Sequence, residues 1–276
     1  MATNEQPAVA TSPGVSRPSL TREVAPASQA RIRVRAGGGG YCIGSPKNPT
    51  HHGPQDDSFV YDPSVRETWH DRWAHLKWNT KAGVCAAVGP FVGSDGPLGC
   101  SEISAAFYDH YLHDNGEDVD YDLSKAYAED ESIRDDIDAE TYRAQRAAEE
   151  LFQTSGTSAF EMTGDNHNIG YNPATASWQK ALGSYDLWGS AKVTVDNGVA
   201  TMTFTAHAED RYNFNRGASD IATGTPDDVN GRFAALGWAH GFNTHGTTTR
   251  TVTWTVGSMP TTTKASVPTY IRTTSE

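Results

Sequence analysis

The chain has 276 residues, of which 37% are hydrophobic, and it carries 22 basic and 34 acidic residues for a net charge of −12. This length is enough for one large or two small domains with a sizeable core. The acidic balance excludes a nucleic-acid binder, which needs a basic face. No apolar stretch approaches the roughly 18 residues of a transmembrane helix, so we expect no transmembrane segment.

The two ends of the chain are poor in large apolar side chains. Residues 1–36 are rich in Ala, Thr, Ser and Pro, the glycine-rich stretch "AGGGGYCIGSPKNP" follows, and residues 258–276 are again polar. Such segments cannot bury enough apolar surface to offset their ordering entropy. We therefore expect a disordered leader and Gly-rich linker over residues 1–57 and a disordered tail over residues 258–276.

The leader also lacks the basic start and the apolar run of a signal peptide. The leader is either a linker without a specific function or a segment that an export machinery recognises. The sequence therefore predicts a protein that is cytoplasmic before any export, and that leaves the cell by a route independent of a signal peptide.

Residues 58–152 are expected to be helical. In "PSVRETWHDRWAHLKW" the apolar side chains fall on one helical stripe, which predicts a helix packed through that stripe. These side chains are Val65, Trp69, Trp73 and Leu76. The following "GVCAAVGPFVGSDGPLGC" is too rich in glycine for a helix throughout, so we expect a tight buried loop. Cys85 and Cys100 flank this loop and are either buried thiols or a disulfide.

Two further helical patterns follow. The stretch "SEISAAFYDHYLHDNG" predicts a helix that ends at Asn115-Gly116. Residues 114–150 hold 14 acidic and 4 basic residues, a net charge of −10. Two helices with a solvated negative face are expected there, contributing little to the core. Such a face confers solubility, or it docks a basic partner or a cognate immunity protein.

The pattern changes to β structure over residues 153–257. Asn197-Gly198 is a strong hairpin signal, and the residues after it alternate, with Met202 and Phe204 on one face and threonines on the other. "TPDDVNGRFAALGWAHGF" predicts one crossing helix, and "TTTRTVTWTVG" a closing strand. The expected fold class is α+β, with N-terminal helices followed by an antiparallel sheet crossed by one helix.

The hairpin leads into the polar cluster "DRYNFNR" at residues 210–216. Continued alternation places Asp210 and Tyr212 on one side and Arg211 on the other. These residue types suit phosphoester chemistry, because Asp210 would hold a metal or steer a water, Tyr212 would position a group or donate a proton, and Arg216 would grip phosphate oxygens. In the structural alternative, a buried Asp–Arg pair closes the end of the sheet.

Two histidines after the crossing helix, His240 and His245, are candidates for the general acid or base. A divalent metal such as Mg²⁺ would be held by Asp210 together with a ligand from elsewhere, for which Asp220, His240 and His245 are the candidates. For each histidine the alternative is an ordinary loop residue without a catalytic role.

The stretch "VTVDNGVATMTFTAHAEDRYNF" resembles the hairpin and loop of colicin M-type bacteriocins, over about 25 residues of the chain. The resemblance implies cleavage of lipid II at a phosphoester with a divalent metal. Asp210 and Tyr212 stand at the family's first Asp and its Tyr. Asn213 replaces the family's second Asp, and the family's His-Arg pair is absent, with only Arg216 nearby.

Over a longer span, roughly residues 100–256, four stretches resemble a family of bacterial effector-like proteins that occur as cargo or toxin domains of injection systems. These are "HYLHDNGEDVDYDL", "WQKALGSYDLW", "DRYNFNRG" and "GRFAALGWAHGFNTHGTTTRTVTW". Together the resemblances imply an exported or injected antibacterial effector that hydrolyses a lipid-linked, lipid II-like phosphoester. The alternative is a non-enzymatic cargo, structural or binding component of a contractile injection system.

Overall fold

A computed structural model describes residues 33–34, 40–44, 57–92, 101–219 and 225–258. Within them one sheet of eight strands runs in the order β1-β2-β4-β6-β7-β8-β3, with β5 paired to β6 off this path. The strands are Arg33–Val34 (β1), Tyr41–Ile43 (β2), Val119–Asp122 (β3), Ala159–Thr163 (β4), His167–Asn168 (β5), Asp186–Asp196 (β6), Val199–Tyr212 (β7) and Phe242–Thr255 (β8). Among these described strands only the pairing of β3 with β8 is parallel, so the α+β prediction is confirmed.

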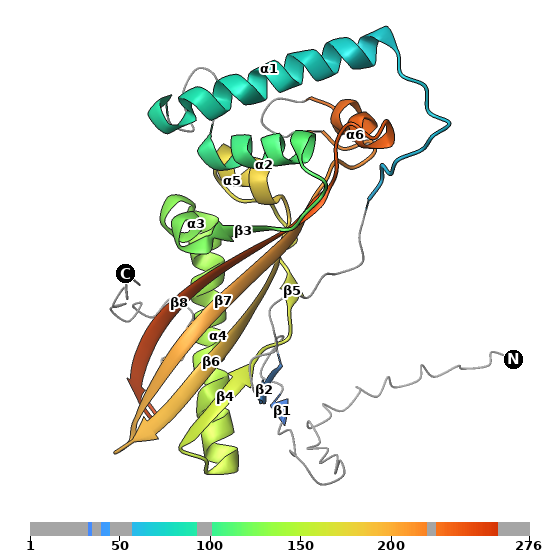
Figure 1. The fold of residues 1–276 in the computed structure, drawn as a ribbon. Helices are drawn as coiled ribbons and strands as arrows, with labels where there is room; N and C mark the ends of the chain where they lie inside the picture. The colour runs from blue at the N-terminus through green and yellow to red at the C-terminus, as the bar shows by residue number, and fades with distance from the viewer. Residues whose placement is uncertain (1–32, 35–39, 45–56, 93–100, 220–224, 259–276) are drawn as a thin grey trace, which may run out of the picture.

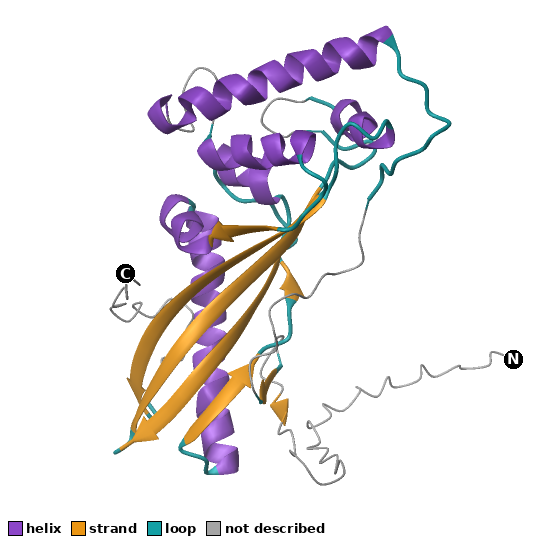
Figure 2. Ribbon diagram, viewed as in Figure 1, coloured by secondary structure: helices purple, strands orange, loops and turns teal. Residues whose placement is uncertain are grey.

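The centre of the sheet is the hairpin that the sequence predicts. β6 and β7 pair from Asp196↔Val199 to Asp186↔Glu209, and β7 continues against β8 as far as Tyr212↔Phe242. Asn197 and Gly198 form the turn with positive φ angles of 48° and 78°, the backbone that an Asn-Gly turn favours. Figure 2 shows how far β6, β7 and β8 extend beyond the other strands.

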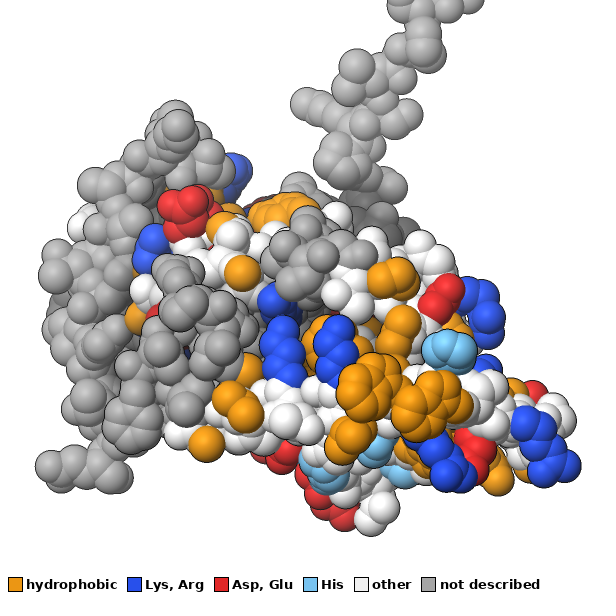
Figure 3. Space-filling view, turned by 90° about the horizontal axis from the view of Figure 1, so that it is seen from above, with side chains coloured by type: hydrophobic (Ala, Val, Ile, Leu, Met, Phe, Trp, Pro, Cys, Tyr) orange, Lys and Arg blue, Asp and Glu red, His pale blue; other side chains and the backbone are white. Residues whose placement is uncertain are grey.

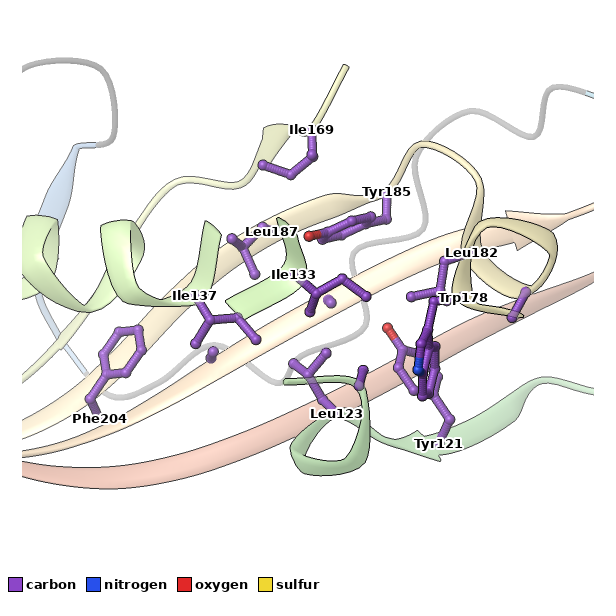
Figure 4. Packing of buried hydrophobic residues seen from close by; sticks show 14 of the residues in the cluster. Tyr121, Leu123, Ile133, Ile137, Ile169, Trp178, Leu182, Tyr185, Leu187 and Phe204 are labelled. Atoms are coloured by element: carbon purple, nitrogen blue, oxygen red, sulfur yellow. The ribbon is translucent and has the colours of Figure 1, made fainter. Parts of the chain in front are cut away.

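The acidic segment forms α3 (Leu123–Glu129) and α4 (Glu131–Ser155), and α4 lies along one face of the sheet (Figure 1). The prediction that this segment adds little to the core is wrong, because α4 buries a full apolar stripe: Ile133, Ile137, Ala144, Ala147, Ala148 and Leu151. The stripe packs with Phe204 and Leu187 from the sheet in one cluster (Figure 4). A helix with many acidic residues can still be part of the core, because its charged side chains lie on one face and its apolar side chains on another.

Four helices gather at the end of the sheet where β3, β7 and β8 meet (Figure 1). They are α1 (Trp69–Val92), α2 (Glu102–His113), α5 (Ala176–Leu182) and α6 (Asp227–Ala235). α2 and α6 confirm the predicted helices, and Phe107 and Tyr111 of α2 are buried. No helix among the described residues is long and apolar enough to cross a membrane.

α1 departs from the sequence prediction in two ways. It continues through the glycine-rich stretch as far as Val92, where a loop was expected. The stripe expected to face the core is exposed, with Trp69 at 71% and Trp73 at 59% of their full accessibility. The opposite side, including Asp71 and Ala82, is buried instead. Periodicity fixes which residues share a face, but the neighbouring helices decide which face is covered.

Most of the predicted disordered leader, linker and tail lies outside the described residues. The exceptions are β1 and β2, which pair with each other, and β2 also pairs with β4. For these residues the prediction is wrong. Tyr41 shows why, since its side chain is completely buried against the α4 side of the sheet. Cys42 is a free thiol and Cys85 is disulfide-bonded, whereas Cys100 lies outside the described residues.

Candidate active site

The polar cluster follows the predicted alternation at the end of β7. Asp210 and Tyr212 continue the face of Phe204 and Ala208, the face that α4 and α2 cover. Arg211 points to the other side. Asp210 sits opposite Thr244 of β8, whose hydroxyl donates to the Asp210 carbonyl at 3.3 Å. The strand end therefore holds the Asp210 carboxyl on a rigid mount inside the fold.

Burial raises the pKa of the Asp210 carboxyl well above its usual range, and the negative charge of Asp186 raises it further. A backbone N–H from Arg211 opposes the shift but does not cancel it. The residue as a whole keeps some accessible surface, so the raised pKa comes from the packing around the carboxyl rather than complete enclosure. The Asp210 carboxyl therefore holds its proton to higher pH than an ordinary aspartate does, which suits a proton donor.

Tyr121 of β3 lies beside this carboxyl. Burial raises the pKa of its phenol, and the charges of Asp210 and Glu209 add to the shift. The Tyr121 hydroxyl is buried and has no hydrogen-bond partner among the described residues. Sequence reasoning missed Tyr121, because it lies 89 residues before Asp210 and reaches it only through the parallel pairing of β3 with β8.

Asp186, at the start of β6, has both carboxylate oxygens held. The side-chain amide of Asn166 donates to one oxygen at 3.1 Å, and that of Asn168 donates to the other at 3.0 Å. The charge of Asp186 acts on the pKa of both Asp210 and His167. The charge of Asp186 therefore affects the pKa of a group at the end of β7 and of one in the short strand β5.

His167 of β5 faces α4. Burial, and to a smaller extent the charge of Arg143, lower the pKa of His167 to about 4. The Arg143 Nη2 lies 2.9 Å from the His167 Nε2, and 2.9 Å from a Glu140 oxygen. Because arginine only donates, His167 accepts at Nε2 and carries its proton at Nδ1. The Arg143 side chain keeps 30% of its accessibility, so it is partly accessible to solvent while its Nη2 contacts His167 and Glu140.

Glu140 is the buried partner of Arg143. Its side chain is 1% exposed, and burial raises the pKa of its carboxyl although Arg143 opposes the shift. The buried Tyr41 hydroxyl donates to Glu140 at 2.5 Å. Tyr41 thereby ties β2 to α4, and it is a polar contact that the sequence prediction of a disordered linker did not anticipate.

The remaining predicted site residues do not gather around Asp210. Tyr212 is 8% exposed and packs among aromatic rings, the nearest being Phe242 at 5.0 Å between ring centroids. The Arg216 guanidinium lies over the Phe59 ring at 4.6 Å. His240 is exposed, and its Nδ1 contacts the Asp114 carbonyl at 3.0 Å.

His245 lies on the opposite face of the sheet from Asp210. Its Nδ1 is 3.1 Å from the Asp120 carboxylate, and its ring stacks on His207 with centroids 6.0 Å apart. His207 in turn contacts the Ser190 hydroxyl at 2.9 Å. Burial lowers the pKa of His207 to about 4. The predicted partnership of Asp210 with His245 is therefore wrong, since the sheet separates the two side chains.

The structural alternative, a buried Asp210–Arg pair, is also not what forms. Arg211 makes two bonds to Asp57, at 3.1 and 2.8 Å, and the Asn213 amide donates to Asp57 at 3.0 Å. The basic and amide residues of the cluster thus hold the segment before α1. Phe59 follows Asp57 and lies so close to Gly231 of α6 that a Cβ there would meet its ring at 2.1 Å.

The described residues do not fit the predicted metal site. They contain no group of three or more His, Cys, Asp or Glu side chains arranged to hold a metal ion. A carboxyl with a raised pKa, such as that of Asp210, is also a poorer ligand, because metal binding requires the deprotonated form. Asp220, the second predicted ligand, lies outside the described residues, so the divalent metal stays a prediction.

Comparisons with known proteins give little further guidance. No family model matches the chain, and no curated protein matches it. Among solved structures, the truncated bacteriocin syringacin M from Pseudomonas syringae pv. tomato DC3000 is similar, at 11% sequence identity. The match has a TM-score of 0.38 and covers 67% of this chain and 84% of that chain. A likeness of this degree assigns no function.

Proposed function

We propose that the chain is an antibacterial effector that hydrolyses a lipid-linked phosphoester by acid catalysis at the end of β7. The observation that carries the acid part is the Asp210 carboxyl, whose pKa burial raises well above its usual range. A carboxyl in an apolar environment is a common proton donor in hydrolases. The substrate class comes from the sequence resemblance of residues 193–214.

In the proposed reaction a water forms the new bond to phosphorus and releases its proton to solvent. Asp186, whose carboxylate accepts from the amides of Asn166 and Asn168, pairs with Glu209 on the opposite face of the sheet from Asp210 and acts on Asp210 through its charge. The bond from phosphorus to the leaving oxygen breaks, and Asp210 donates its proton to that oxygen. Asp210 then regains a proton from solvent.

Arg143 is the cation proposed to bind the phosphoryl oxygens. Its guanidinium contacts Glu140 and His167, and the side chain is partly accessible to solvent. Guanidinium groups suit phosphate because two parallel N–H donors match two oxygens. Arg143 takes the phosphate-binding role that the sequence predicted for Arg216, whose guanidinium lies over the Phe59 ring.

A second candidate is a non-enzymatic cargo or binding component of an injection system. The observation in its favour is that Arg211, Asn213 and Arg216 all serve to hold residues 57–59. In this reading the polar cluster is an attachment point for the segment that leads into α1. The export route and an immunity-protein partner stay predictions under either candidate.

Incubation of the purified chain with a lipid-linked phosphoester at neutral pH separates the two. Hydrolysis by the wild type, its loss in Asp210→Asn and Arg143→Gln, and its retention in the surface control Lys192→Gln are expected. A folded wild type that leaves the ester intact, with and without added Mg²⁺, contradicts the enzyme. Activity that disappears in EDTA would support the predicted metal.

A further inference from the structure

The outer face of α1 is a continuous apolar surface. Trp69, Trp73, Leu76 and Val84 are exposed, at 71%, 59%, 58% and 43% of their full accessibility. With 3.6 residues per turn these positions fall on one stripe. The Trp69 and Trp73 rings stack with centroids 6.1 Å apart. A continuous stripe of this kind marks an interaction site rather than scattered exposed residues.

The polar atoms on this face do not need water. Thr80 lies on the same stripe and donates its hydroxyl to the Leu76 carbonyl at 2.7 Å, inside the helix itself. Among the described side chains of α1, Asp71 is the acidic one. It is buried on the opposite side of the helix and pairs with Arg232. The outer face is therefore ready to leave water without stranding a donor or a carboxylate.

Lysines border the stripe. The Lys77 and Lys81 amines lie 5.3 and 5.2 Å from the centre of the Trp78 ring, so their stems run along the helix while their charges stay at its edge. This local positive charge stands out on a chain with a net charge of −12. Figure 3 looks onto this end of the molecule and shows large hydrophobic side chains next to Lys and Arg.

The helix is held rigidly from below, so the stripe is fixed in orientation. Asp71 accepts two bonds from Arg232 of α6. His75 packs against the Phe233 ring at 5.2 Å, and Trp78 against the Tyr108 ring at 6.1 Å. α1 is also the outermost element at its end of the molecule (Figure 1), which leaves its outer face open to a broad, flat surface.

We propose that the outer face of α1 docks the protein on an anionic lipid surface. The helix would lie in the plane of the interface, with Trp69, Trp73 and Leu76 at the level of the headgroups and upper acyl chains. Tryptophan and lysine are the side chains that suit this boundary. The charge pattern decides for lipid, because the basic border complements anionic headgroups. The inference does not rest on the proposed hydrolysis.

Co-sedimentation of the full chain with vesicles tests the proposal. Binding is expected to vesicles of phosphatidylcholine with phosphatidylglycerol, and much less to phosphatidylcholine alone. The double variant Trp69→Ser/Trp73→Ser is expected to lower the partition coefficient about tenfold or more. Lys77→Gln/Lys81→Gln is expected to lower it about fivefold per lysine, with a loss of salt sensitivity.

Two matched controls keep the test specific. Val199→Ser removes an exposed apolar side chain at the β6–β7 turn, and Lys192→Gln removes an exposed charge on the sheet. Both are expected to bind as the wild type does. All variants should have the melting temperature of the wild type, since the changed side chains are exposed.

Equal binding to neutral and anionic vesicles, or wild-type binding by the tryptophan variant, overturns the proposal. So does a dimer in solution that becomes a monomer in the tryptophan variant, because the face would then belong to a second copy of the chain.

Discussion

Replacing Asp210 by asparagine is expected to make the fold more stable than the wild type, by a margin that grows as the pH rises. Burial and the charge of Asp186 raise the pKa of the folded-state carboxyl well above its usual range. The unfolded chain has the ordinary value of about 3.9. Asparagine keeps the shape of the protonated carboxyl but has no proton to lose.

The sign follows from proton linkage. Between the unfolded and the folded pKa the folded state holds one proton more than the unfolded state, so the stability of the wild type falls with rising pH. The slope is about 1.4 kcal/mol per pH unit for one group. For each pH unit between the unfolded and the folded pKa the wild type should therefore lose about 1.4 kcal/mol relative to Asp210→Asn. The difference levels off at the folded pKa.

Urea unfolding of both proteins over a series of pH values measures this difference. The other groups with raised pKa, such as Asp136 and Glu140, titrate in both proteins and cancel in the comparison. Asp196→Asn, in the exposed turn of the hairpin, is the matched control and should show no such slope.

A difference that is constant with pH would refute the reasoning. An asparagine variant that becomes less stable than the wild type as pH rises would mean that Asp210 is an ionised, partnered carboxylate. In that case it could not be the proton donor proposed for hydrolysis.

Three further outcomes are expected. Ile137→Ala, at a fully buried position of α4, should cost about 2–5 kcal/mol in urea unfolding, whereas Glu150→Ala on the exposed side should stay within about 0.5 kcal/mol; equal effects would show that α4 is not part of the core. Hydrogen bonds from its arginine partner Arg232 lower the pKa of Asp71 to about 2, so Asp71→Asn should remove about 1–2 kcal/mol of stability at neutral pH. That stability is present above about pH 4 and is lost as the pH falls toward about 2. The variant and the wild type should therefore be equally stable in acid. Arg211→Gln should release Asp57 and speed proteolysis of the segment before α1, while a cutting pattern like that of the wild type would show that the pair does not hold the segment.

The alternation of residues 200–212 determines much of the sheet without any structure. Apolar and threonine side chains at a period of two, after an Asn-Gly turn, are compatible with one pairing of β6 and β7. The same alternation places Asp210 and Tyr212 on the inner face. These features are local, so the sequence is sufficient to predict them.

The candidate site was predicted less well because its members come from distant segments. Asp210 lay among the predicted residues, but Asp186, His167 and Arg143 did not. Nothing in the local sequence of β5 or α4 signals that these side chains meet. His245 was predicted as a partner and lies on the other face, because β8 pairs with β7 in a register that the sequence alone does not reveal.

The sequence by itself determined the central hairpin with its register, the helices α2, α4 and α6, and the faces on which side chains lie together. Only the tertiary structure decided which faces are covered. The acidic α4 became the central helix because its alanine-rich stripe meets the long sheet, and the tryptophans of α1 face outward because Asp71, His75 and Trp78 contact α6 and α2. Periodicity records which side chains share a face, but burial depends on contacts between segments far apart in the chain.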